Sequence, residues 1–243
     1  MRLARIPTAT GAILYAPSRI DQPVVADFEP GELARAGRID GTARGRGTVW
    51  FVTARDGAGA WVLRHYHRGG FVGRLVAERY LWRGEDATRP FRELRLLATL
   101  EERQLPAVRP VAARYVRTAL GYRADLLTVA IPGARSLASL LSPDLALEVW
   151  RGIGATLRAF HAAGVCHADL TAHNVLIDAA GRAHLVDFDR GSLRTAGAWQ
   201  ARNLARLRRS LAKLTATEPQ RCTPRQWAAL LEGYAAARGA PRR

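Results

Sequence analysis

Residues 165–191, "VCHADLTAHNVLIDAAGRAHLVDFDRG", concentrate reactive side chains in a chain that is otherwise poor in acids. The stretch holds three histidines, four aspartates and an asparagine between short apolar runs. Asp169 and Asn174 stand in the order His-x-Asp-x-x-x-x-Asn, and Asp187 begins an Asp-Phe-Asp triplet. These motifs are individually weak, but their order and spacing together indicate one chemical site.

The segments "HNVLID" and "AHLVDF" predict two short strands joined by an Ala-Ala-Gly turn. Such a hairpin returns Asp187 close to Asn174, so that both residues can share one metal ion. Carboxylate and amide oxygens suit Mg²⁺, and a carboxylate at Asp169 can orient an attacking hydroxyl group. The pattern therefore predicts Mg²⁺-assisted phosphoryl transfer from ATP, with Asp169 catalytic and Asn174 and Asp187 as metal ligands.

Upstream residues supply the other parts that this chemistry requires. Gly45 and Gly47 precede a predicted strand, in a loop whose backbone amides can approach phosphates. Arg64 lies on the following strand, and Glu93 lies on the helix after it. Protein kinases use lysine at the strand position, but arginine can also bind phosphate and pair with a carboxylate. Arg64 and Glu93 are therefore predicted to help bind the nucleotide.

The order of predicted elements indicates an α+β protein with two lobes, in the manner of protein kinases. The front part has strands at 48–54, 60–66, 108–117 and 124–131, with a helix at 89–105. The rear part is mostly helical, with helices at 143–163, 198–214 and 223–237. We expect an N-terminal lobe over residues 1–129 and a C-terminal lobe over residues 130–243, together forming one kinase domain with a minimal activation segment.

The composition restricts location and partners. Thirty-seven basic residues against 21 acidic ones give a net charge of +16, which favours polyanionic partners. The chain has two cysteines and no apolar run long enough to cross a bilayer, so we expect a reducing, cytoplasmic setting. The positive charge could also indicate a nucleic-acid-binding protein. This hypothesis is weaker, because the sequence contains no recognition motif or aromatic stacking pattern.

Five segments together resemble the 3-deoxy-D-manno-octulosonic acid (Kdo) kinases, lipopolysaccharide-core sugar kinases that are distant relatives of protein kinases: "GRGTVWF", "VLRHYHRGG", "YRADLLT", "HADLTAHNVLID" and "LVDFDRG". The resemblance implies ATP-dependent phosphorylation of Kdo, at its 4-hydroxyl, on a lipid A precursor. It also implies peripheral attachment to the cytoplasmic side of the inner membrane. The arginine at position 64, where protein kinases have lysine, is similar to what that family has at this strand position.

Other readings stay open. Ala168, Thr171 and the short segment after Asp189 favour a small-molecule or glycolipid acceptor over a peptide. A kinase for heptose or an aminoglycoside, and a non-catalytic nucleotide-binding module, are the alternatives. The basic amphipathic segment 71–82 is a candidate membrane contact. The segment 199–214 has the pattern of ordinary packing, and we interpret His167 as a structural brace for the loop. The sequence makes no prediction of oligomeric state.

Overall fold

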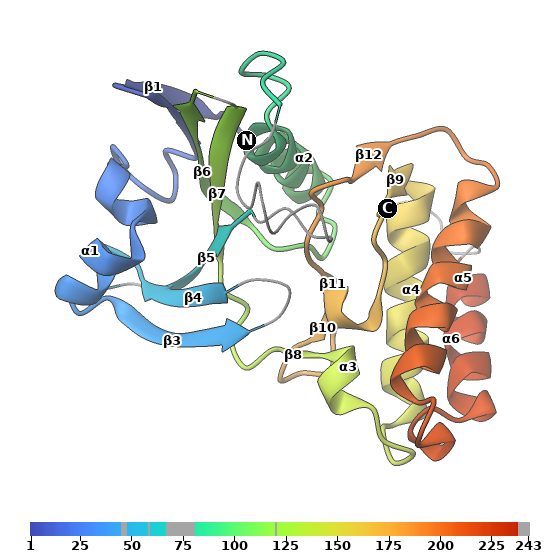
Figure 1. Cartoon of the computed structure of the whole chain (residues 1–243). Coiled ribbons are helices and arrows are strands. Elements are labelled where there is room, and N and C mark those ends of the chain that lie inside the picture. The colour runs from blue at the N-terminus through green and yellow to red at the C-terminus, as the bar shows by residue number, and fades with distance from the viewer. Residues whose placement is uncertain (45–47, 58, 67–80, 120, 238–243) are drawn as a thin grey trace. The chain divides into compact units, whose positions relative to one another are not determined.

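The computed structural model describes residues 1–44, 48–57, 59–66, 81–119 and 121–237 (Figure 1). The chain divides into two compact units. The first comprises Met1–Thr99 and Val108–Ala130, and the second comprises Leu100–Ala107 and Ile131–Arg243. A sheet dominates the first unit and helices dominate the second (Figure 1). The predicted α+β class is confirmed.

The first unit contains an antiparallel sheet with the strand order β1-β2-β6-β7-β5-β4-β3 in the described residues. Its strands are β1 (Ala4–Thr8), β2 (Gly11–Tyr15), β3 (Ile39–Arg44), β4 (Thr48–Thr53), β5 (Ala60–His65), β6 (Pro110–Thr118) and β7 (Gly121–Val129). The predicted strands correspond to β4, β5, β6 and β7. The helical elements are η1 (Val25–Phe28), α1 (Pro30–Arg35) and α2 (Arg89–Glu102), whose last three residues belong to the second unit.

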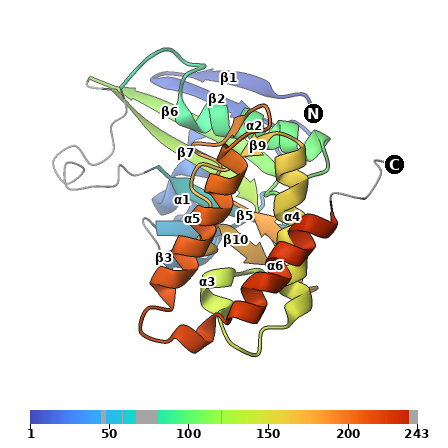
Figure 2. The same cartoon turned by 90° about the vertical axis from the view of Figure 1, so that its right-hand side faces the viewer.

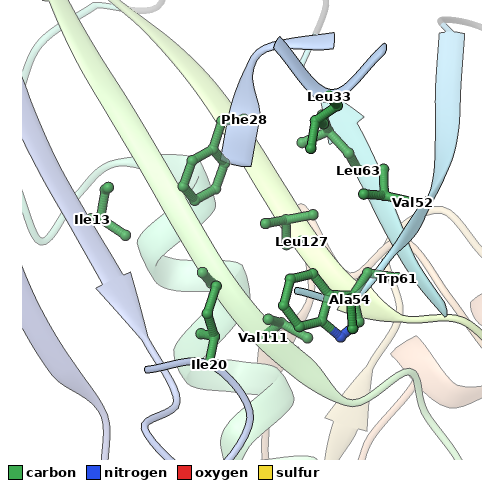
Figure 3. Close-up of a cluster of buried hydrophobic side chains, with 11 residues drawn as sticks. Ile13, Ile20, Phe28, Leu33, Val52, Ala54, Trp61, Leu63, Val111 and Leu127 are labelled. Atoms are coloured by element: carbon green, nitrogen blue, oxygen red, sulfur yellow. The ribbon is translucent and has the colours of Figure 1, made fainter. Parts of the chain in front are cut away.

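Side-chain alternation along the strands gives the sheet two apolar faces. Leu63 on β5 pairs with Leu127 on β7, and both are fully buried. They gather with Phe28, Leu33 and other apolar side chains into a core on one face of the sheet (Figure 3). Because successive strand residues point to opposite faces, Arg64 is directed away from this core.

Helix α2 covers the opposite face with an apolar stripe. Its residues Phe91, Leu94 and Leu97 recur at three-residue spacing and are fully buried. This periodicity is the signal that predicts the helix from sequence, and the helix begins at Arg89 as expected. The stripe leaves Glu93, which lies between two of its members, available to meet Arg64.

Two parts of the sheet are not predicted by the sequence pattern. Residues 4–15 form the β1–β2 hairpin, and β3 precedes the glycine-containing segment. Strand β1 contains Pro7, which weakens any strand signal, but the strand lies at the edge of the sheet, where proline is tolerated. The apolar run in β2 is short, so its strand signal is weak as well.

The second unit carries three longer helices: α4 (Leu147–Ala162), α5 (Trp199–Leu214) and α6 (Pro224–Ala236). Its smaller elements are β8 (Arg135–Ser136), α3 (Leu137–Leu140), β9 (Val165–Cys166), η3 (Ala172–Asn174), β10 (Val175–Ile177), β11 (Ala183–Leu185), β12 (Ser192–Leu193) and η4 (Pro219–Arg221). In the described ranges, no helix combines the length and apolarity needed to span a membrane.

The start of α4 differs from the prediction, which placed it at residue 143. The side-chain amide of Gln226 donates to the carbonyl groups of Ser142, Pro143 and Leu145, at 2.8, 3.2 and 3.1 Å. These carbonyls are therefore held by α6 in a turn, and the helix begins only at Leu147. A capping contact from a distant helix is not visible in the local sequence.

Helices α4 and α6 approach each other closely through two glycines (Figure 2). A Cβ atom on Gly154 would lie 1.9 Å from the carbonyl oxygen of Leu230, and one on Gly233 would lie 2.1 Å from that of Arg151. Only glycine fits at either place. This contact fixes α4, the helix from which the chain enters the reactive stretch.

Candidate active site

The hairpin of β10 and β11 places Asp187 beside Asn174, as predicted. The two strands pair antiparallel, with Val175 opposite Leu185. Just beyond this pair, the backbone amide of Val186 donates to the carbonyl of Asn174 at 3.1 Å. Asp187 directly follows the residue that is hydrogen-bonded to Asn174.

Asn174 is also tied to Asp169. Its side-chain Nδ2 donates to the backbone carbonyl of Asp169 at 2.8 Å. This bond closes the loop between Asp169 and Asn174, and it engages the nitrogen end of the amide. The oxygen end is the part of this side chain that a cation requires.

Asp187 has an uncommon backbone conformation, with φ of 65°. A left-handed conformation is costly for a residue other than glycine, although aspartate tolerates it better than most. Such strained residues cluster at functional sites. The conformation arises where β11 has ended, so it sets the direction of the Asp187 side chain independently of the pleat of that strand.

His167 is a structural brace, as interpreted from sequence. It is buried, and its Nε2 donates to the backbone carbonyl of Val186 at 2.8 Å. Burial lowers the pKa of His167, while the negative charges of Asp187 and Asp169 act to raise it. Burial is the larger of these effects, so the imidazole is neutral at pH 7 and serves as a hydrogen-bond donor to the Val186 carbonyl.

Helix α5 holds the loop with three side chains that the sequence pattern does not mark. Asn203 accepts from the backbone amide of His167 at 3.2 Å. Ser210 accepts from the backbone amide of Ala172 at 3.1 Å. Between them, Arg206 donates to the carboxylate of Asp169, from Nε at 3.0 Å and also from Nη2. Helix periodicity marks this segment as amphipathic, but it does not reveal which polar residues reach a loop.

The segment after Asp187 is short, as predicted for a minimal activation segment. It forms β12, which pairs with β9, the strand just before the loop of residues 167–174. Gly164, with φ of +73°, accepts from the amide of Arg194 at 2.7 Å, and a Cβ there would lie 2.6 Å from the Arg194 carbonyl oxygen. The chain then enters α5 at Trp199.

In the first unit, Arg64 and Glu93 form an ion pair. Nη2 of Arg64 lies 2.5 Å from Oε2 of Glu93, which is 2% exposed. The hydroxyl of Tyr66 donates to the same oxygen, and the Arg64 guanidinium lies 4.6 Å from the Tyr66 ring centroid. Because Arg64 retains partial exposure, it can present charge to an anion, which is its predicted role.

Gly45 and Gly47, predicted to approach phosphates, lie outside the described residues. So does most of segment 71–82, the candidate membrane contact. Of that segment, Leu81 is 67% exposed and Trp82 packs against Tyr115, with ring centroids 5.2 Å apart.

The oxygen donors at Asn174 and Asp187 fit magnesium. Within the described part of the chain, no three or more His, Cys, Asp or Glu side chains gather into a metal-binding group. Magnesium is commonly held by one or two carboxylates together with substrate phosphates. The amide oxygen of Asn174 and the carboxylate of Asp187 suit that arrangement, because the backbone bond from Val186 to Asn174 brings the two residues close together.

Three features together define a class, the kinase-type phosphotransferases: a loop that carries a carboxylate, an amide and a carboxylate at the ends of the following hairpin, and an arginine paired with the buried Glu93. The comparison with known families agrees. The chain belongs to the lipopolysaccharide kinase (Kdo/WaaP) family, whose model matches residues 33–234. It is therefore an enzyme that transfers a phosphoryl group to an alcohol, with a kinase-like fold.

Individual relatives cover nearly the whole chain. A protein of Stenotrophomonas maltophilia (strain K279a) named 3-deoxy-D-manno-octulosonic acid kinase is 44% identical over 92% of this chain and 89% of its own. One of the same name from Xanthomonas axonopodis pv. citri (strain 306) is 44% identical over 94% and 91%. A third, from Actinobacillus succinogenes, is 42% identical over 85% and 89%.

Proposed function

We propose that the protein phosphorylates the Kdo residue of a Kdo-bearing lipid A precursor, with ATP as donor. The name shared by the relatives supports Kdo as the acceptor sugar. The observation that carries the chemistry is the hydrogen-bonded arrangement of Asp169, Asn174 and the residue before Asp187. The 4-hydroxyl is the proposed site of attack, on the basis of family resemblance.

Asp169 is the proposed catalytic carboxylate, which orients the acceptor hydroxyl and accepts its proton. The hydroxyl oxygen then bonds to the γ-phosphorus of ATP as the bond to the β,γ-bridging oxygen breaks, and ADP leaves with that electron pair. The two Arg206 contacts and the Asn174 bond hold Asp169 in one orientation. Such positioning is a large part of catalysis in this class.

Asn174 and Asp187 are the proposed ligands for Mg²⁺. When bound, Mg²⁺ neutralises charge on the phosphates. Arg64, held by Glu93 and Tyr66, is proposed to bind a phosphate group of ATP. The buried carboxylate of Glu93 keeps the guanidinium in place, because moving it away would leave a buried charge unpaired.

We further propose that the protein acts at the cytoplasmic side of the inner membrane as a peripheral protein. The acceptor is a lipid, so its sugar is presented at a membrane surface. The net charge of +16 supports an anionic partner there.

The test uses purified protein, ATP, Mg²⁺ and a Kdo-bearing lipid A precursor in neutral detergent micelles. Mass spectrometry should show the gain of one phosphoryl group, and phosphorus NMR should place it on the 4-oxygen of Kdo. Heptose-bearing lipid and an aminoglycoside, assayed side by side, should give rates at least roughly tenfold lower.

Three outcomes would change the proposal. Faster turnover of another acceptor would replace Kdo as the substrate. Phosphate on another oxygen would correct the regiochemistry alone. ATP binding without phosphoryl transfer to any of the acceptors would indicate a non-catalytic nucleotide-binding protein.

A further inference from the structure

Helix α5 carries five cations and no acid: Arg202, Arg206, Arg208, Arg209 and Lys213. At 3.6 residues per turn, four of them fall within an arc of about 60° on the helix surface. We call these four, Arg202, Arg206, Arg209 and Lys213, the α5 cation stripe. Arg208 lies outside the arc, and its guanidinium lies 5.9 Å from the Trp227 ring centroid.

Acidic residues of the chain neutralise little of the charge of the α5 cation stripe. Arg202, Arg209 and Lys213 are exposed, and among the described residues none of the three forms an ion pair. The fourth member, Arg206, is paired with Asp169. By contrast, Arg151 on α4 donates to Glu148 and Glu232.

This arrangement opposes helix stability. Like charges at four-residue spacing, as at Arg209 and Lys213, repel each other. A cation in the first turn, as at Arg202, is also unfavourable beside the positive end of the helix dipole. An external anion would remove both penalties.

The α5 cation stripe runs beside the catalytic loop. Asn203, Arg206 and Ser210 contact loop residues 167, 169 and 172 in the same order. From Arg202 to Lys213 the stripe spans about 16 Å at 1.5 Å per residue. A molecule that presents a hydroxyl at Asp169 can therefore extend along several cations of one helix.

We propose that the α5 cation stripe docks the anionic groups of the acceptor glycolipid: the carboxylate of its sugar and the phosphates of its lipid carrier. This inference rests on the proposed function, because that function supplies an acceptor with anions spaced along its length. Guanidinium groups match carboxylate and phosphate geometry, and three of the four stripe residues are arginine. The stripe thereby selects a polyanionic acceptor and directs its hydroxyl to Asp169.

The test replaces Arg202, Arg209 and Lys213 together with glutamine and leaves Arg206 in place. The KM for the Kdo-bearing precursor in neutral micelles should rise roughly tenfold, while kcat and the KM for ATP stay within about twofold. Added salt should raise the acceptor KM of the wild type more than that of the variant, because salt screens exposed charges.

A matched control removes three charges elsewhere. Arg2, Arg123 and Arg225 are exposed, and their triple glutamine variant has the same net charge as the stripe variant. The control should keep the wild-type KM for the acceptor. Equal KM values in the two triple variants would overturn the proposal, because net charge alone would then account for any change.

A further experiment distinguishes binding of the acceptor from binding of a membrane surface. Binding to phosphatidylglycerol vesicles without acceptor is measured for the same proteins by co-sedimentation. Loss of vesicle binding with an unchanged acceptor KM in neutral micelles would overturn the proposal and make the stripe a membrane contact. An acceptor KM that rises in neutral micelles supports it.

Folding and the proposed function are checked in the same series. Thermal unfolding should show the triple stripe variant at least as stable as the wild type, since repulsion is relieved. If the triple variant does not fold, the single variants Arg209→Gln and Lys213→Gln test the proposal instead. Each should raise the KM for the acceptor about two- to threefold. A wild-type protein that does not phosphorylate the precursor refutes the proposed function; an active wild type with unaffected stripe variants refutes only the docking surface.

Discussion

Arg206 on α5 directs two nitrogen donors at one oxygen, Oδ1 of Asp169. The residues are 37 positions apart in sequence, so this contact joins a helix to the loop of residues 167–174. The Arg206 side chain is 41% exposed and that of Asp169 is 24% exposed. The pair is therefore solvent-accessible, and its main effect is to restrict the orientation of the carboxylate.

Replacing Arg206 with glutamine should lower kcat about tenfold, because Asp169 then loses the two contacts that orient it. The KM for ATP should stay close to the wild-type value. Arg206→Lys keeps the charge with a different donor geometry, so it should restore part of the lost kcat. Steady-state kinetics of both variants provide the measurement. A lowered melting temperature with unchanged kcat would limit Arg206 to a structural role.

Replacing Asp169 with asparagine should lower kcat by roughly 10²–10⁴, the usual scale for loss of a general base. Asparagine has nearly the same shape and can still accept from Arg206, so the fold and ATP binding should persist. Single-turnover kinetics and thermal unfolding, measured on one preparation, separate the two effects. Turnover at the wild-type rate would remove Asp169 from its assigned role.

Replacing Glu93 with glutamine should raise the KM for ATP, by about tenfold, because Arg64 loses its charged partner. The first unit provides a matched control at Glu85, which accepts from Arg5 and from the hydroxyl of Tyr115 in the same way that Glu93 accepts from Arg64 and Tyr66. Glu85→Gln should leave the KM for ATP unchanged. Equal effects at both positions would indicate general loss of sheet stability instead of a nucleotide contact.

The sequence predicts those parts of the site that are close in the chain. Asn174 and Asp187 are joined by one hairpin, and hairpin signals are local, so their proximity was predictable. Arg64 and Glu93 were predictable because a strand and a following helix each have a clear periodicity and the motif order supplied the pairing. The N-terminal hairpin was not predicted, since β1 contains Pro7 and lacks a strong alternating pattern.

Contacts between distant elements were not predictable. The apolar spacing in α5 places Leu204, Leu207, Leu211 and Leu214 on one stripe; in the structure Leu207 and Leu211 are buried, and Leu204 and Leu214 are partly buried. It does not identify Arg206 as the residue that meets Asp169, because that depends on where the loop lies against the helix. The same holds for Gln226, whose side chain determines where α4 begins.

Replacing Gly154 with alanine should destabilise the protein by about 3 kcal/mol or more, because a Cβ atom would force α4 and α6 apart. Gly152 lies on the same helix, and a Cβ atom there would have no neighbouring heavy atom within 4 Å, so Gly152→Ala should stabilise by about 0.5–1 kcal/mol. Urea unfolding of both variants tests this. Similar changes at the two positions would show that helix propensity, and not the contact between helices, sets the outcome.

Acidification below about pH 6.5 should destabilise the protein, in part through His161. Burial lowers the pKa of His161 to about 4, and the nearby charge of Arg158 acts in the same direction. Between about pH 6.5 and 4 the unfolded chain binds a proton that the folded chain does not, so stability falls as the pH falls.

The Nδ1 atom of His161 lies 2.8 Å from the hydroxyl oxygen of Tyr234. A glutamine at position 161 can form a hydrogen bond with the same hydroxyl but does not titrate. His161→Gln should therefore lose roughly 2 kcal/mol less unfolding free energy than the wild type between pH 7 and pH 5. Urea unfolding at the two pH values measures the difference, and parallel losses in both proteins would assign the acid sensitivity to other groups, such as the buried His167.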